Sequence, residues 1–326
     1  IASCVFLFVS VRLCKELHIG NIAMVIAAAV IAFHPTFYIL SASINNDMVM
    51  ILFFMLSFLY TIRWYREPTM KNILILALCI GLGMMSKTSA GTIALITAPV
   101  FVMVLYKAVG QKWVKKLVGQ FAAFIGVCFP LGLWYPIRNL ILFKQPLAYV
   151  LRISEQSDLY CGNYSITQRF LSFPLDQLLT PVYCSATNDY NLWLYNVKCS
   201  VFGEFNFGEG MTEPGQVLIL ANFALILFSL FAMVYVMVRC KKADPFARFG
   251  LFALWLVLMI PFIQFNITFP FGCTMDFRYI APTVVIGAIY TGMAVSDLRS
   301  RGKKWSTLLS YLGIASVGLF IAASVV

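Results

Sequence analysis

Long apolar runs separated by short polar segments are the feature that most constrains how this chain folds. The runs lie near residues 1–14, 19–40, 47–62, 73–86, 90–106, 117–136, 216–238, 249–269, 279–296 and 305–326. A helix needs roughly 20 mostly apolar residues to cross the hydrocarbon core of a bilayer. Backbone polar groups in that core must be satisfied within the segment, which favours helices. The pattern therefore predicts an all-α polytopic membrane protein with about ten transmembrane helices, some of them short.

Basic residues gather in every second connection between these runs. The five clusters are Arg12/Lys15, Arg63/Arg66/Lys71, Lys107/Lys112/Lys115/Lys116, Arg239/Lys241/Lys242/Arg248 and Arg299/Arg301/Lys303/Lys304. These connections contain 17 Lys/Arg and 4 acids, whereas the rest of the chain contains 7 and 9. The positive-inside rule assigns the basic connections to the cytoplasm. The net charge of +11 then reflects orientation in a lipid bilayer, and no nucleic-acid partner is predicted.

The predicted connections differ greatly in length, which suggests three regions. Residues 1–136 form transmembrane helices with short outer-face site loops, residues 137–215 form an extracytoplasmic loop, and residues 216–326 form the C-terminal transmembrane helices. A loop this long is usually functional or a small folded cap. The cytoplasmic loops are too short to hold a catalytic domain, so we expect any chemistry at the outer face or within the bilayer.

Asp47 interrupts this apolar pattern, and ionisable residues inside membrane segments usually mark functional sites. It follows Asn45 and Asn46, and Lys87 lies in the next predicted hairpin. A helical rise of about 1.5 Å per residue places Asp47 and Lys87 roughly 24 Å, and His34 roughly 22 Å, from the cytoplasmic ends of their spans. We therefore expect these side chains at a similar depth near the outer leaflet. The turn at 86–91 is expected to dip into the membrane and line a cavity.

A pocket for a polar headgroup on a lipid tail would explain these residues. The Lys87 ammonium suits a phosphate, and the Asp47 carboxylate suits a sugar hydroxyl or a divalent cation. The alternative is that Asp47 and Lys87 neutralise each other and join two hairpins. For His34, the alternative to a functional role is a hydrogen bond at a helix end.

Five segments occur in an order that is also found in a known group of enzymes. They are HPTFYILSASINND (34–47), GLGMMSKTSAG (81–91), WYPIRNLILFKQPL (134–147), FGEFNF (202–207) and MDFRYIAP (275–282). Together they resemble polytopic glycosyltransferases of the GT-C fold, in particular the protein O-mannosyltransferases and the aminoarabinose transferases of lipid A. The resemblance extends over nearly the whole chain.

The resemblance implies a sugar donor carried on a polyprenyl phosphate and used at the outer face of a bacterial plasma membrane. It implies inverting transfer to a hydroxyl of a glycan, lipid or protein acceptor. In such enzymes an acid in the first external loop acts as the general base. That loop would precede Ile1, so the catalytic residue is expected upstream and no acid of this sequence is assigned to the role.

The resemblance also implies roles for residues near the outer helix ends. Asn46 and Asp47 match the second external loop, where an acid binds metal or orients substrates, and Lys87 matches a basic residue of the following hairpin. No cofactor is required by the sequence, although a divalent cation at Asp47 is a candidate.

Further candidates lie beyond these positions. Arg138 and Asn139 match an "RN" pair before the large loop, and Arg278 and Tyr279 match an "RY" pair that opens a late helix. An arginine at an outer interface can bind phosphate oxygens. It can also extend to lipid headgroups, and Arg278 can pair with the acid two residues before it. Glu204 could contact an acceptor sugar, with a solvated or packing role as the alternative.

Two questions stay open at this level. A transporter or flippase for a lipid-linked or small anionic substrate would use the same charges without forming a bond, and a related fold without catalysis is a further alternative. Cys161, Cys184 and Cys199 share the long loop and Cys273 lies in another, but their spacing selects no disulfide.

Overall fold

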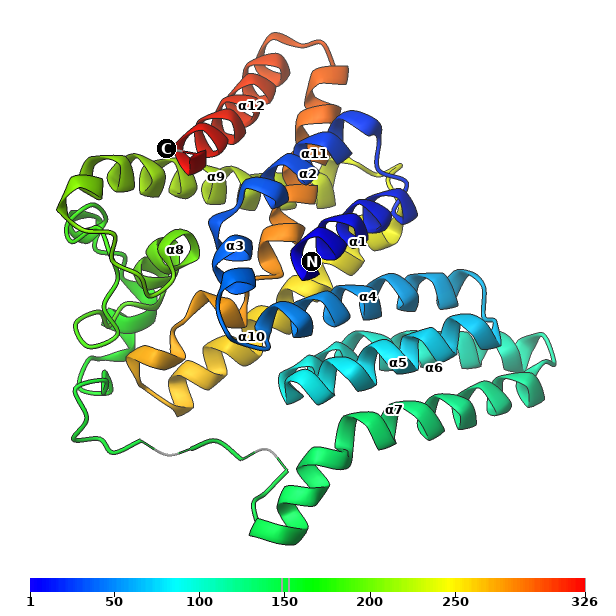
Figure 1. Ribbon diagram of the computed structural model, residues 1–326. Helices are drawn as coiled ribbons and strands as arrows, with labels where there is room; N and C mark the ends of the chain where they lie inside the picture. Colours follow the sequence, from blue (N-terminus) through cyan, green and yellow to red (C-terminus); the bar gives the residue numbers. More distant parts are fainter. Residues whose placement is uncertain (148, 152, 326) are drawn as a thin grey trace. The chain divides into compact units, whose positions relative to one another are not determined.

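The computed structural model describes residues 1–147, 149–151 and 153–325 (Figure 1). The described residues are 76% helical and contain no β-strand. They contain an isolated antiparallel bridge between Tyr160 and Phe271. The predicted all-α fold is therefore confirmed.

The α-helices of the described part vary widely in length. They are α1 (Ala2–Glu16), α2 (Asn21–Phe33), α3 (Pro35–Ala42), α4 (Asp47–Arg66), α5 (Met70–Ser86), α6 (Ala94–Gly110), α7 (Val114–Phe143), α8 (Leu192–Phe202), α9 (Thr212–Arg239), α10 (Leu251–Thr268), α11 (Thr283–Ser300) and α12 (Lys304–Val325). Short 3₁₀ turns are η1 (Thr88–Ile93), η3 (Leu175–Gln177), η4 (Glu209–Met211), η6 (Gly272–Thr274) and η7 (Phe277–Tyr279), and π turns are η2 (Thr167–Leu171) and η5 (Phe246–Gly250).

Fewer helices than predicted are suited to crossing a membrane. Among the described residues, 6 helices are long and apolar enough, or up to 8 if each of two bent helix pairs counts as one span. The prediction of ten was too high, because some apolar runs are short. α1 has 15 residues and ends in charged side chains, and α5 has 17 residues.

Pro35 divides one predicted span into two helices. α2 ends at Phe33, α3 begins at Pro35, and the two helices are bent by 46°. The backbone of His34 is extended, with φ −76° and ψ 119°. Proline disfavours the helical conformation of the residue before it, and it lacks the N–H that would continue the helix. The bend is thus a direct consequence of the His-Pro dipeptide.

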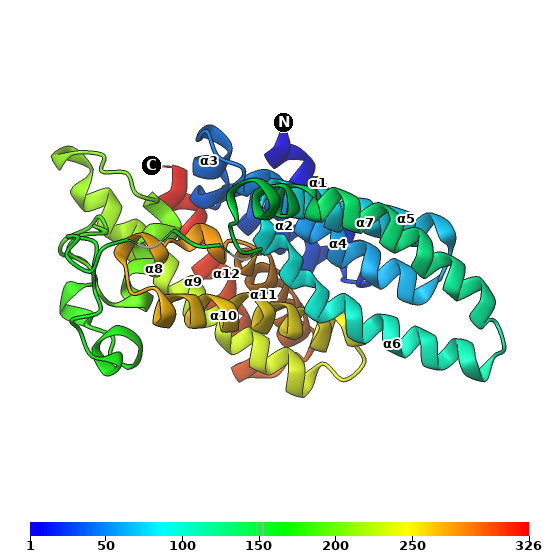
Figure 2. The ribbon, with the colours of Figure 1, turned by 90° about the horizontal axis from the view of Figure 1, so that it is seen from below.

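The chain separates into two compact units. The first comprises Ile1–Leu17 and Ile44–Arg152, and the second comprises His18–Ser43 and Ile153–Val326. In the first unit α5 packs most extensively against α4 and α7, and Figures 1 and 2 show these helices running side by side.

Gly81 permits the close approach of α5 and α7. A Cβ atom at this position would lie 2.8 Å from Leu131 Cβ and 3.2 Å from the carbonyl oxygen of Cys128. Neither atom is the far end of a flexible side chain. Small residues allow helix backbones in membranes to pack closely.

Replacing Gly81 with alanine is therefore expected to destabilise the first unit by about 1–3 kcal/mol, because the new methyl group overpacks this contact. Gly126→Ala on α7 is the matched control, since a Cβ there meets nothing within 4 Å. The thermal unfolding midpoint of each purified variant in detergent measures the effect. Equal midpoints for the two variants would contradict the assigned role of Gly81.

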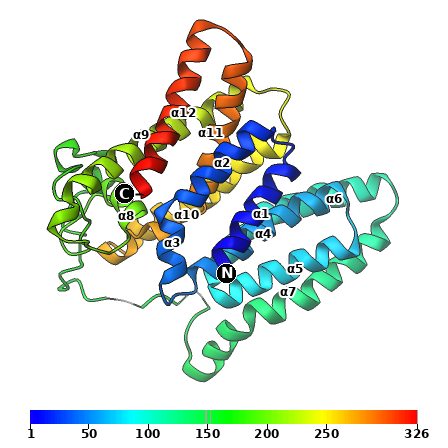
Figure 3. The same cartoon turned by 45° about the horizontal axis from the view of Figure 1, so that its top comes forward.

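The second unit is built around α11. This helix packs on α2, α9 and α12, and Figure 3 shows α11 and α12 joined as a hairpin beside α9. Gly292 lies where α11 crosses α2, and a Cβ there would lie 2.2 Å from the carbonyl oxygen of Ala23. Only glycine fits this crossing without a backbone shift.

Residues 153–211 of the long loop form a folded segment attached to helices of the second unit. Buried Asn191 donates to the carbonyl oxygens of Gln168 and Ser172, both at 2.8 Å, and accepts the N–H of Leu194 at the start of α8. Arg169 donates to the carbonyl oxygen of Asn266 on α10 at 2.7 Å. These bonds satisfy buried backbone groups that irregular segments otherwise leave unpaired.

Candidate functional site

Asp47 is the first residue of α4 and is almost completely buried, with 3% of its surface exposed. Its backbone N–H donates to Oδ1 of Asn45 at 2.9 Å, which closes a local side-chain turn just before the helix, whereas the N-cap residue Asn46 makes no side-chain cap bond. The carboxylate at this helix N-terminus is also stabilised by the helix dipole. The sequence INND thus specifies a helix start and places an acid at it.

Lys87 follows the last residue of α5 and brings an ammonium group to that acid. Its Nζ lies 2.5 Å from Oδ1 of Asp47, and its side chain is 24% exposed against 4% for the carboxylate. The extended backbone at Lys87, with φ −157° and ψ 124°, ends α5 before the turn η1. An ion pair therefore joins the two hairpins. This contact was expected under the alternative in which Asp47 and Lys87 neutralise each other.

Asn46 fastens the same two helix ends. Its Nδ2 donates to the carbonyl oxygen of Ser86, the last residue of α5. This bond satisfies one of the carbonyl groups that every helix leaves unpaired at its C-terminus. We refer to Asn46, Asp47 and Lys87 as the Asp47–Lys87 cluster, which lies entirely within the first unit.

The cluster contains a single carboxylate, and that carboxylate is paired with an ammonium group. No group of three or more His, Cys, Asp and Glu side chains that could hold a metal occurs in the described part of the chain. A cation at Asp47 would have to compete with the ammonium of Lys87 for the same carboxylate oxygen. The buried acid orients the ammonium group of Lys87, whose side chain is partly exposed, and an ammonium can bind a phosphate as a point charge.

Arg138 and Asn139 lie near the end of α7, which continues through Pro136 to Phe143. Arg138 is exposed and donates to Oδ1 of Asn139 at 3.2 Å, and its guanidinium lies 5.7 Å from the Phe143 ring centre. The predicted pair is therefore in mutual contact within the first unit.

Arg278 and Tyr279 belong to η7 in the second unit. Asp276 caps this turn by accepting the N–H of Arg278 at 2.9 Å, and its other oxygen lies 3.2 Å from Nε of Arg278. The local ion pair considered from the sequence is therefore present. The Tyr279 ring packs edge-on against Phe265, with ring centres 5.7 Å apart.

His34 and Glu204, also in the second unit, have contrasting surroundings. His34 is 4% exposed and its ring lies beside those of Phe37, Phe277 and Phe320. Its Nδ1 is buried and has no hydrogen-bond partner, so the expected helix-end bond from this atom is not formed. Glu204 lies in the exposed turn that follows α8.

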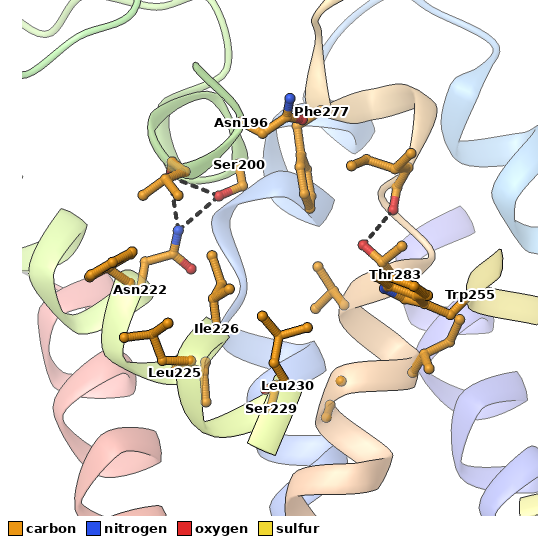
Figure 4. Close-up of a pocket in the computed structure, with 18 of the residues that line it drawn as sticks. Asn196, Ser200, Asn222, Leu225, Ile226, Ser229, Leu230, Trp255, Phe277 and Thr283 are labelled. Carbon is orange, nitrogen blue, oxygen red and sulfur yellow. Dashed lines mark hydrogen bonds between the residues drawn. The ribbon is translucent and has the colours of Figure 1, made fainter. Parts of the chain in front are cut away.

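A cavity of about 320 Å³ lies inside the second unit, and Figure 4 shows its walls. α8, α9, α10 and α11 supply most of its lining, which is mainly aliphatic and aromatic and includes Ile226, Leu230 and Trp255. No Asp, Glu, Lys or Arg occurs among the described residues that line it. The cavity is therefore suited to an uncharged apolar group.

Asn222 lines this cavity, but it was not predicted from the sequence as a candidate site residue. Its Nδ2 donates to the carbonyl oxygen of Val197 at 2.9 Å and to Oγ of Ser200 at 2.8 Å, which connects α9 to α8 (Figure 4). An amide inside the apolar run 216–238 was the available signal, because polar residues in such runs usually have a specific partner.

These features define a multi-pass membrane protein with buried charge at its helix ends and an apolar cavity. A family model described as dolichyl-phosphate-mannose-protein mannosyltransferase matches residues 1–185, more than half of the chain. The chain belongs to this family, and it is a membrane glycosyltransferase of the GT-C type. No curated protein and no solved structure matches it.

Proposed function

We propose that this protein transfers a sugar from a polyprenyl-phosphate carrier to an acceptor hydroxyl, with inversion, at the extracytoplasmic face of a bacterial plasma membrane. The observation that carries the proposal is the Asp47–Lys87 cluster, a buried acid that holds an ammonium group at adjoining helix ends. Membership of the mannosyltransferase family supports a lipid-linked donor. The basic clusters support the orientation, because they alternate with the connections that hold the predicted site residues.

In the proposed reaction, the acceptor oxygen attacks the anomeric carbon on the side opposite the phosphate. The bond from that carbon to the phosphate oxygen breaks, the acceptor hydroxyl gives its proton to a general base, and the polyprenyl phosphate leaves with increased negative charge. Lys87 would stabilise this charge, and Asp47 would position Lys87 before the donor arrives. Asn46 would fix the helix ends that hold both groups. No residue of the sequence is assigned as the general base.

The apolar cavity of the second unit would bind a hydrocarbon chain such as an isoprenoid. Its lining is uncharged and mainly aliphatic or aromatic, which fits a hydrocarbon chain and disfavours its phosphate group. Burial of apolar surface contributes about 0.8 kcal/mol per CH₂ group, so even a short stretch of chain adds useful affinity.

The remaining predicted residues keep proposed roles in the same reaction. Arg138 of the first unit would bind an anionic group of a substrate with support from Asn139. Arg278 of the second unit, beside Tyr279, keeps a separate proposed role in substrate binding. The long external loop, including Glu204, would contact the glycan, lipid or protein acceptor.

Membrane vesicles with a radiolabelled polyprenyl-phosphate sugar test this function. We expect label in a covalent product and free polyprenyl phosphate in equal amount. The transporter alternative predicts that the donor changes leaflet while its sugar–phosphate bond stays intact. Intact donor on the opposite leaflet, without product, would contradict the proposed transfer.

A further inference from the structure

The segment 181–184 runs alongside α8, in the same direction as the helix. Nζ of Lys198 donates to the carbonyl oxygen of Pro181 at 2.5 Å, and the ring centres of Tyr183 and Phe202 are 5.1 Å apart. The earlier residue of the segment contacts the earlier part of α8, and the later residue contacts its end. They hold the segment against one side of α8, and they bring its last residue, Cys184, to the end of that helix.

Cys184 reaches the C-terminus of α8, where its Sγ donates to the carbonyl oxygen of Gly203 at 3.1 Å. The N–H of the same glycine bonds to the carbonyl oxygen of Cys199, one helical turn earlier, at 2.8 Å. Cys199 is buried, with 2% of its surface exposed. Its pKa is raised, first by the adjoining Cys184 thiol and then by burial. The two thiols are therefore neighbours, although 14 other residues separate them in the sequence.

Cys161 and Cys273 are also near one another, because burial first and the Cys273 thiol to a smaller extent raise the pKa of Cys161. The N–H of Cys161 bonds to the carbonyl oxygen of Pro270 at 2.9 Å, in the short antiparallel bridge that includes Phe271. Cys161 therefore lies opposite Pro270, three residues from Cys273, and backbone pairing does not align the two thiols.

We propose that Cys184 and Cys199 form a disulfide bond in the mature protein. The inference rests on the proposed function in one respect, namely that the long loop faces the oxidising side of the membrane, where such bonds persist. Each thiol loses a proton, the two sulfurs form one bond, and two electrons reduce the disulfide of an extracytoplasmic thiol oxidase to two thiols.

This bond would close a loop that contains Asn191, the residue whose side chain makes several hydrogen bonds within the folded segment. That side chain connects the turn near Ser172 to the start of α8. A bond across these residues restricts the unfolded segment and so favours its folded form. Burial of Cys199 also shields the bond from reductants.

Maleimide labelling of the purified, denatured protein tests the proposal, with intact mass as the readout. The chain has nine cysteines, so we expect seven labels without reductant and nine after reduction. Cys184→Ser releases its partner, and the unreduced count should rise from seven to eight. Cys79→Ser, a buried cysteine of α5, is the matched control and should lower the count by one. A digest without reduction should contain the peptides of Cys184 and Cys199 joined together.

Nine labels on the unreduced wild type, or a fall in the count for Cys184→Ser, would overturn the disulfide. An exposed reporter, Ser165→Cys, separates this result from a failure of the proposed function. If a membrane-impermeant maleimide labels the reporter on intact cells, the loop is external and only the disulfide is wrong. If the reporter reacts only after permeabilisation, the proposed orientation is wrong as well.

Discussion

Replacing Lys87 with methionine is expected to lower sugar transfer by about 10²-fold or more, while the protein stays folded. Methionine keeps the length and apolar stem of the side chain but removes the ammonium group. The leaving phosphate then develops its charge without the donor that Asp47 holds at 2.5 Å. Initial rates at saturating donor, together with the thermal unfolding midpoint, measure the two effects separately. Lys71→Met, at the exposed opposite end of α5, is the matched control and should leave the rate unchanged.

The ion pair would also be present if its only role were to join two hairpins. A double substitution is needed to separate this structural role from a role in sugar transfer. Lys87→Met alone leaves the buried Asp47 carboxylate without this partner, which can cost about 3–5 kcal/mol. Asp47→Asn removes that charge, and the double variant is expected to recover stability. Under the proposed function its transfer stays as low as that of Lys87→Met. Recovery of transfer together with stability would show that the pair is structural only.

Filling the cavity of the second unit is expected to weaken binding of long-chain donors. Ile226→Trp adds bulk to a side chain that lines this space (Figure 4). Loss of contact with a few CH₂ groups, at about 0.8 kcal/mol each, should raise KM roughly 10–100-fold. A donor with a short, water-soluble chain does not fill the cavity, so its KM should change little. Comparing KM for the two donors measures the effect.

Leu220→Trp is the control for this experiment, because Leu220 is an exposed residue of the same helix and is not among the cavity residues. It should leave both KM values unchanged. Equal increases for short and long donors in Ile226→Trp would mean that the substitution disturbs the unit generally. No change for the long-chain donor would remove the cavity from the proposed binding site.

Several local features followed directly from the sequence. The bend at His34 follows from Pro35, and the turn just before α4 follows from Asn45, which accepts the N–H of Asp47. The number of spans was overestimated, because an apolar run predicts burial but does not set helix length. α1 and α5 end before they reach the length of a full span, at charged residues in α1 and at the extended Lys87 in α5.

The sequence by itself determined the class of protein, because long apolar runs and alternating basic connections permit little other than a helical membrane fold. It also identified Asp47 and Lys87, since charge in such runs is costly. Only the tertiary structure decided that these two side chains touch, that Arg278 pairs locally with Asp276, and that Cys184 lies at the end of α8, one helical turn from Cys199. Such contacts depend on how separate segments pack, and apolar packing leaves little pattern in a sequence where most residues are apolar.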